Sequence, residues 1–348
     1  MKFLRATLPL DAVSRHRAVL YGVAALWLMF FHSPIPIPEG EALGQILLWL
    51  KHSAGTCCVE IFVLLSPMGL YRSLESGRGL ASFYRRRLLR VALPAFIVAA
   101  FFHGIGAGSL KDYALALTFF SYWFGGPVFW YVAFILTMYL VYPALHALGR
   151  RSPRALWALF ALSFPLTLLA ERALPGWSSL CAGGIDRIPA FLLGCALAPA
   201  LVRGGRVPAW ACVAVTAVYV PVASYTFALG GVRSFWLLSI CNLLLAIPMI
   251  AVLTAAAEWL ARGAARRYFY RLLTMAGAVS LEIYLLYSRL LDLLAQTEAY
   301  RSGAASDGRR VLAAVVLTPL ASVALSAFCR TLERSFHATR APKIEAKG

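Results

Sequence analysis

The sequence predicts an all-α membrane protein, a bundle of about ten transmembrane helices with both termini on the cytoplasmic side. Two observations predict this fold. First, 61% of the 348 residues are hydrophobic and only 14% are charged, whereas soluble domains carry about 45–50% apolar and about 25% charged residues. Second, apolar runs long enough to cross a bilayer recur along the whole chain. We therefore expect one membrane-embedded domain over residues 1–348, with a short cytoplasmic tail from about residue 331.

Each predicted span is an apolar run of about 17–25 residues, the length that crosses a hydrocarbon core. The runs cover residues 17–34, 54–73, 88–106, 128–147, 154–171, 187–202, 208–229, 233–256, 272–294 and 310–330. A further apolar stretch, 113–124, is too short to cross and is expected to be interfacial or re-entrant. Because the connecting loops are short, any chemistry is expected within the bundle or at its edge.

The net charge of +18 comes from 33 Lys and Arg residues against 15 Asp and Glu residues. Even numbers of predicted spans separate the basic clusters, at 2–17, 72–90, 150–154, 203–206, 262–271 and 330–347. Cationic loops stay in the cytoplasm, so this pattern predicts that all six clusters lie on the inner side. No basic domain lies outside the spans, which argues against nucleic-acid binding.

Histidines and cysteines give no metal-ligand pattern. His32, His52 and His103 all fall toward the predicted outer side, but their spacing matches no known ligand set. The seven cysteines are scattered and lie mostly inside apolar runs. We therefore expect no metal site, and we interpret the cysteines as small lipid-buried or core residues.

Ionisable residues inside lipid are costly, which makes them functional candidates. His32 ends the first run, at the predicted outer face, and its proton comes off near neutral pH, as a general base requires. The alternative is an interfacial histidine that anchors a helix end. Glu60, in the second run, is placed to orient an imidazole as the carboxylate of a triad does. A structural carboxylate paired with an arginine or a backbone donor is an equal alternative.

An arginine cluster lies at the inner mouth of the third run. Arg87 and Arg90 are three residues apart and share a helix face, with Arg86 beside them. Guanidinium forks suit phosphate groups, so a phosphate site is one interpretation. An ordinary positive-inside anchor is the other.

The ninth run carries a second set of charges. Glu282 lies inside the run, Arg289 follows seven residues later on the same face, and Asp292 lies three residues beyond. Either a structural ion network or the lining of a polar cavity explains this set, and the sequence does not decide between them.

Six of these segments, taken in order, resemble acyltransferase family 3, bacterial membrane proteins that O-acylate cell-envelope and exported glycans. The resembling segments are Ala18–His32, which ends in Phe-His, then Val59–Ser66, the arginine-rich Phe83–Pro94, Trp130–Pro143, Phe191–Gly194 and Ser280–Tyr287. The resemblance implies a multi-pass protein of the bacterial inner membrane. It also implies an acyl-CoA co-substrate, acetyl-CoA above all, with no permanently bound cofactor, and a glycan or lipid-linked saccharide as acceptor.

On this resemblance His32 and Glu60 are the expected catalytic residues, and Arg86, Arg87 and Arg90 the expected acyl-CoA ligands. The residues expected to line the cavity are Arg17, Tyr21, Ser66, Glu282, Tyr287 and Arg289. Three positions depart from the family pattern. Tyr21 replaces the usual cation eleven residues before the histidine, and Arg17, one turn earlier, is a possible substitute. Tyr287 replaces the family's late histidine, and Pro67 replaces a glycine.

These departures keep two alternatives open. One is a homologue that has lost catalysis. The other is a transporter or flippase of a lipid-linked saccharide, with Glu282, Arg289 and Asp292 along its path. The sequence shows no paired internal repeats of the kind that transporters carry, which argues mildly against the second alternative.

Overall fold

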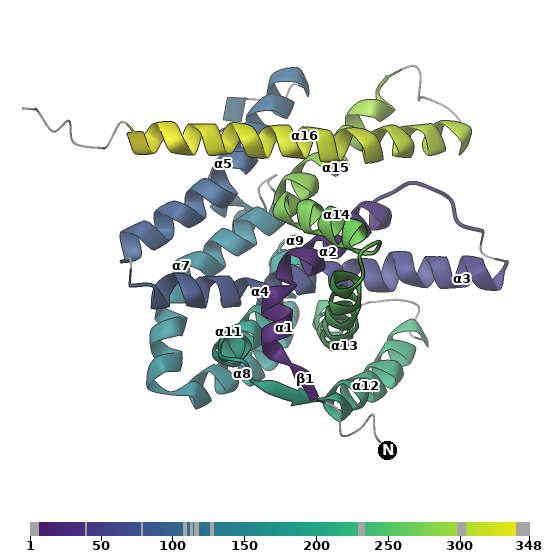
Figure 1. Ribbon diagram of the computed structural model, residues 1–348. Coiled ribbons are helices and arrows are strands. Elements are labelled where there is room, and N and C mark those ends of the chain that lie inside the picture. The colour runs from purple at the N-terminus through teal and green to yellow at the C-terminus, as the bar shows by residue number, and fades with distance from the viewer. Residues whose placement is uncertain are drawn as a thin grey trace, which may run out of the picture.

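The computed structural model describes residues 7–338, except 39, 78, 107–109, 112–113, 115–117, 126–128, 229–233 and 298–303. Helices make up nearly all of it (Figure 1). They are α1 (Leu10–Arg15), α2 (Arg17–Phe31), α3 (Ala42–Trp49), α4 (Gly55–Glu75), α5 (Leu80–Gly106), α7 (Trp130–Arg151), α8 (Pro153–Ala173), α9 (Pro175–Leu180), α10 (Ala182–Ile185), α11 (Ile188–Arg203), α12 (Ala209–Ala228), α13 (Phe235–Arg262), α14 (Arg267–Ala278), α15 (Ser280–Ala295) and α16 (Ala304–Ala338). A π-helical turn, η2 (Leu50–Ala54), joins α3 to α4, and a 3-10 turn, η3 (Phe120–Phe124), precedes α7.

The helices confirm an all-α membrane bundle. Every predicted apolar run falls on a helix, although the ninth run is split between α14 and α15. Among the described residues, six helices are long and apolar enough to cross a membrane, and the bent α14–α15 pair would make a seventh. Three runs do not pass this test: α2 has only 15 residues, α5 begins with the arginine cluster, and the part of α12 that was tested, Ala209–Tyr225, is too short. The count of ten spans therefore stays a prediction.

Part of the short apolar stretch 113–124 lies outside the described residues. Its last five residues form η3, which packs against α7, α9 and α10. The Trp123 indole donates to Thr137 Oγ1 at 2.9 Å, and Tyr122 Oη accepts from the backbone N–H of Gly184 at 3.0 Å. In this part of the stretch the chain forms a packed turn.

The break between α14 and α15 is a bend of 76°. It lies where α14 crosses α2 with almost no space between the backbones. A Cβ added at Gly22 would collide with the carbonyl oxygen of Leu273, and one added at Gly277 would collide with that of Ala18. This glycine pair lets the two helices touch, which brings the start of α15 against α2.

The basic loops gather at one end of the bundle, which we call the basic end. Strand β1 (Thr7–Pro9) pairs antiparallel with β2 (Arg206–Pro208), so the N-terminal segment lies beside the α11–α12 connection. The side-chain contacts at this end are Arg72–Ser14, Arg15–Glu258 at 3.3 Å, His16–Tyr270 at 3.1 Å, Arg203–Tyr71 at 3.0 Å and His146–Glu75 at 3.1 Å. That both termini lie at this end, on the cytoplasmic side, stays a prediction.

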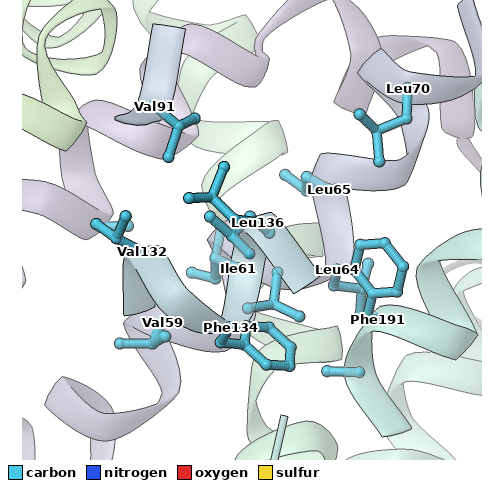
Figure 2. Packing of buried hydrophobic residues seen from close by; sticks show 14 of the residues in the cluster. Val59, Ile61, Leu64, Leu65, Leu70, Val91, Val132, Phe134, Leu136 and Phe191 are labelled. Carbon is cyan, nitrogen blue, oxygen red and sulfur yellow. The ribbon is translucent and has the colours of Figure 1, made fainter. Parts of the chain in front are cut away.

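The apolar core lies between α4, α5, α7 and α11. Figure 2 shows the facing side chains: Val59, Ile61, Leu64, Leu65 and Leu70 from α4, Val91 from α5, Val132, Phe134 and Leu136 from α7, and Phe191 from α11. Gly194 lets α11 approach the backbone of α4 at Leu64. This packing fixes α4, which supplies one wall of the cavity described next.

Candidate active site

A cavity of about 500 Å³ lies between α2, α4, α5, α7 and the α14–α15 bend. Its volume falls within the range of small-molecule sites. The close contacts between α4 and α2 show the direction of the long axis of the cavity. Gly55 lies against Phe31 at one end, and Gly69 lies against Arg17 at the other. The two helices therefore run antiparallel along the cavity, and each level is lined by residues from both.

The end of the cavity nearest the basic end carries the guanidinium groups of Arg17 and Arg87, and we call it the cationic end. Arg15 also lines this end, but its guanidinium is paired with Asp11 and Glu258. Arg87 Nη2 donates to the carbonyl oxygen of Gly69 at 3.2 Å. A Cβ at Gly69 would lie 2.7 Å from Arg17 Nη1, so the absence of a side chain there makes room for Arg17. The Arg87 guanidinium also lies 5.8 Å from the centre of the Tyr139 ring.

Neither cation of this pair is neutralised. In the part of the chain that the structure describes, no carboxylate lies within ion-pair distance of Arg17 or Arg87, and Arg87 Nε is buried without a hydrogen-bond partner. Two like charges in one cavity repel each other unless an anion lies between them. Their arrangement suits a phosphate or another polyanionic group.

Arg90 also lines the cavity, but it is already paired. Its guanidinium hydrogen-bonds both carboxylate oxygens of the buried Glu282, with Nη2–Oε2 at 3.4 Å, and donates to the carbonyl of Ala278 at 2.9 Å. The pair ties α5 to the α14–α15 bend. Glu282 therefore acts at the cavity wall through Arg90.

Polar side chains line the middle of the cavity. Ser66 Oγ lies 3.3 Å from Tyr139 Oη, and either hydroxyl can be the donor. Tyr21 lies one turn along α2 from Arg17, whose guanidinium is 5.9 Å from the centre of the tyrosine ring. Arg17, Tyr21 and Ser66, three of the residues expected to line a cavity, do line this one.

The far end of the cavity is aromatic, formed by Phe62, Tyr131 and Tyr284, and we call it the aromatic end. Ring centres are 5.0 Å apart for Tyr21–Phe62, 6.4 Å for Phe62–Tyr131 and 5.3 Å for Tyr131–Tyr284. Tyr284 Oη accepts from the backbone N–H of Tyr131 at 3.4 Å, satisfying a donor in the first turn of α7. Leu28 and Val59 complete this end.

His32 caps α2 one turn beyond the aromatic end. Its backbone N–H donates to the carbonyl of Leu28 at 3.1 Å, and its exposed ring contacts Phe31 with centres 4.9 Å apart. The cavity therefore runs along α2 toward His32 and stops just short of it.

Glu60 follows the cavity residue Val59 but points to a different partner. Its buried carboxylate Oε1 lies 3.6 Å from Arg187 Nε, and the same guanidinium lies 3.5 Å from Asp186 and 5.1 Å from the centre of the Trp130 ring. The structure thus shows the arginine-paired carboxylate that was the alternative for Glu60. Sequence reasoning missed Arg187 and Asp186. Arg187 stands at the start of the apolar run 187–202, and a cation at that position was a candidate partner for the Glu60 carboxylate.

Besides His32, Glu60 and Glu282, three further expected site residues lie outside the cavity lining. Arg86 donates to Ser82 and to Ser73 Oγ at 3.2 Å, and Arg289 is exposed with its guanidinium 5.5 Å from the Phe129 ring centre. Tyr287 is buried in an apolar cluster with Met29. Among the described residues, no three His, Cys, Asp or Glu side chains lie together in a metal-ligand group.

The fold and the site together define a class: a multi-pass helical membrane protein with an internal cavity that is cationic at one end and aromatic at the other. The family model described as an acyltransferase domain, that of acyltransferase family 3, matches residues 19–327, and the chain belongs to this family of acyl-transferring enzymes. Neither a curated protein nor a solved structure matches the chain. Arg17 lies just outside the matched range.

Proposed function

We propose that the protein transfers an acyl group, acetyl in particular, from cytoplasmic acyl-CoA to a hydroxyl of a cell-envelope or exported glycan. The enzyme works in the bacterial inner membrane, with the basic end in the cytoplasm. The observation that carries the proposal is the polarity of the cavity, with unpaired Arg17 and Arg87 at one end and an uncharged end one turn from His32.

Acyl-CoA matches this polarity. Its phosphates carry negative charge, its arm is long and largely uncharged, and its thioester is at the far end of the arm. The phosphates bind at the cationic end, where charge-assisted hydrogen bonds to guanidinium groups are strong. The α-helical rise places Leu28 roughly 16 Å from Arg17 along α2, so the arm extends through the cavity toward His32.

Arg17 takes the place of the missing cation at Tyr21. It lies one turn earlier on the same face of α2 and faces Arg87 across Gly69. Arg90, which is paired with Glu282, forms part of the cavity wall beside the phosphate site. The phosphate ligands are thus proposed to be Arg17 and Arg87, and Arg86 is left outside the site.

The transfer step uses His32 as general base. Its imidazole takes the proton of the acceptor hydroxyl while the hydroxyl oxygen attacks the thioester carbon. The carbon–sulfur bond then breaks, and the proton passes from the imidazolium to the CoA thiolate. Such general-base catalysis contributes about 10²–10⁴ in rate. A cavity that excludes bulk water also limits hydrolysis of the thioester.

Glycan analysis tests this function. Surface glycans from a strain that lacks the gene should lose an O-acyl mass that the wild-type gene restores. Purified protein in nanodiscs should bind acetyl-CoA, which a transporter of saccharides has no reason to do. Unchanged glycans together with no acetyl-CoA binding would exclude the proposed enzyme.

A further inference from the structure

Phe62 occupies a particular place at the aromatic end. Its ring lies between those of Tyr21 and Tyr131, with centres 5.0 Å and 6.4 Å away, and it faces the cavity. Behind it lies a second buried cluster that includes Met29, Ile283 and Tyr287. Phe62 packs against this cluster and against the main core, so it is the partition between the cavity and a filled interior.

Such a partition limits what the cavity can hold. Protein interiors are close-packed, and a chain that extends past Phe62 has to displace side chains that already fill the space. The ring of Tyr284 beside this wall is held in place, because its hydroxyl accepts from the backbone N–H of Tyr131 at 3.4 Å, and the Tyr131 ring packs against it with centres 5.3 Å apart. A flexible ligand that enters from the cationic end therefore meets a fixed aromatic wall.

We propose that Phe62, held between Tyr21 and Tyr131, sets the longest acyl chain that the protein accepts. This inference rests on the proposed function, because it places the thioester of acyl-CoA at the aromatic end. With the phosphates at Arg17 and Arg87 and the arm along the cavity, the acyl group comes to lie against Phe62. Acetyl and propionyl groups fit in front of the ring, whereas octanoyl and longer chains do not.

The substitution Phe62→Leu tests this role. Leucine keeps the side chain apolar and fills part of the site, but it removes the flat ring that separates the cavity from the second cluster. The matched control is Phe160→Leu. Phe160 is likewise partly buried and packed against the core, but it lies in α8 among Trp157 and Phe164, outside the residues that line the cavity.

The experiment measures equilibrium binding of CoA, acetyl-CoA and octanoyl-CoA to full-length protein in nanodiscs. The wild-type protein and the control should bind octanoyl-CoA at least about tenfold more weakly than acetyl-CoA, a difference of the size that overpacking produces. Phe62→Leu should bring octanoyl-CoA to within a few-fold of acetyl-CoA and leave the affinity for CoA unchanged.

The outcomes separate the two proposals. Equal binding of octanoyl-CoA and acetyl-CoA by the wild-type protein would overturn the role of Phe62 and leave the acyl-CoA site intact. The same holds if octanoyl-CoA stays excluded in Phe62→Leu while acetyl-CoA still binds. If neither CoA nor acetyl-CoA binds, the proposed function fails, and the inference fails with it.

Discussion

Arg187 Nε lies 3.6 Å from Glu60 Oε1, and both side chains are buried. The same guanidinium lies 3.5 Å from Asp186, so one buried cation is shared by two carboxylates. The contact joins α4 to the start of α11, beside the aromatic end of the cavity. Removing one member of a buried ion pair is costly, because the remaining charge is left without compensation.

We predict that Arg187→Met destabilises the protein by about 3–5 kcal/mol, the range found when one partner of a buried pair is removed. The measurement is thermal or denaturant unfolding of the purified protein in detergent. Arg289→Met is the control, because that side chain is exposed. The double variant Arg187→Met with Glu60→Gln should recover part of the loss. Equal stability of Arg187→Met and the control would show that the pair contributes nothing.

The crossing of α2 and α14 gives a second prediction. Gly22→Ala and Gly277→Ala should each destabilise the protein by about 1–3 kcal/mol, because the added methyl group forces the two backbones apart. Gly308→Ala is the matched control within α16, since its Cβ would meet nothing within 4 Å. Alanine favours a helix over glycine by up to about 1 kcal/mol, so the control should be neutral or more stable. A stabilising Gly277→Ala would contradict the tight crossing.

Topology is tested separately. The β1–β2 pairing and the Arg72–Ser14 contact gather the basic loops at one end, and cationic loops favour the cytoplasm. Reporters fused before Met1 and after Gly348, and one inserted between Gly204 and Gly205, should all report the cytoplasm. Termini that report opposite sides of the membrane would mean an odd number of crossings, which excludes ten, and two outside termini would contradict the predicted orientation.

His32 is the proposed general base, and we predict that His32→Ala abolishes glycan acylation while the protein stays folded. His32→Gln should fail too, because an amide cannot take up the proton. His52→Ala is the control: its ring is also near Phe31, with centres 6.4 Å apart, but it lies outside α2. Mass spectrometry of the glycans reads out each variant. Acylation at the wild-type level in His32→Ala would refute the mechanism.

The sequence was most informative where local pattern decides structure. Apolar runs predicted the helices because each span must satisfy its backbone groups within itself. The one-turn spacing of Arg17 before Tyr21 identified a cation that does line the cavity. The bend at Val279 was not predictable, since no proline lies within 267–295 and the close contact of Gly277 with α2 beside the bend is visible only in the folded chain.

Pairings between distant helices were also beyond the sequence. Arg90 was expected to bind phosphate together with Arg87, but it pairs with Glu282, and Glu60 pairs with Arg187. Spacing along one helix shows which residues share a face, yet it does not show which helix lies opposite. Arg17 and Arg87, the arginines of the cavity lining that have no carboxylate partner among the described residues, became distinguishable only in the folded chain.

Binding of acetyl-CoA by Arg17 and Arg87 variants tests the account most directly. Arg17→Ala and Arg87→Ala should each weaken binding by about tenfold or more, since a hydrogen bond to a charged group contributes about 1.5–3 kcal/mol. Arg86→Ala, on the same helix but directed at Ser82 and Ser73, should bind nearly as the wild type does. An Arg17→Ala, Arg87→Ala double variant that is folded and binds acetyl-CoA with wild-type affinity would contradict the account.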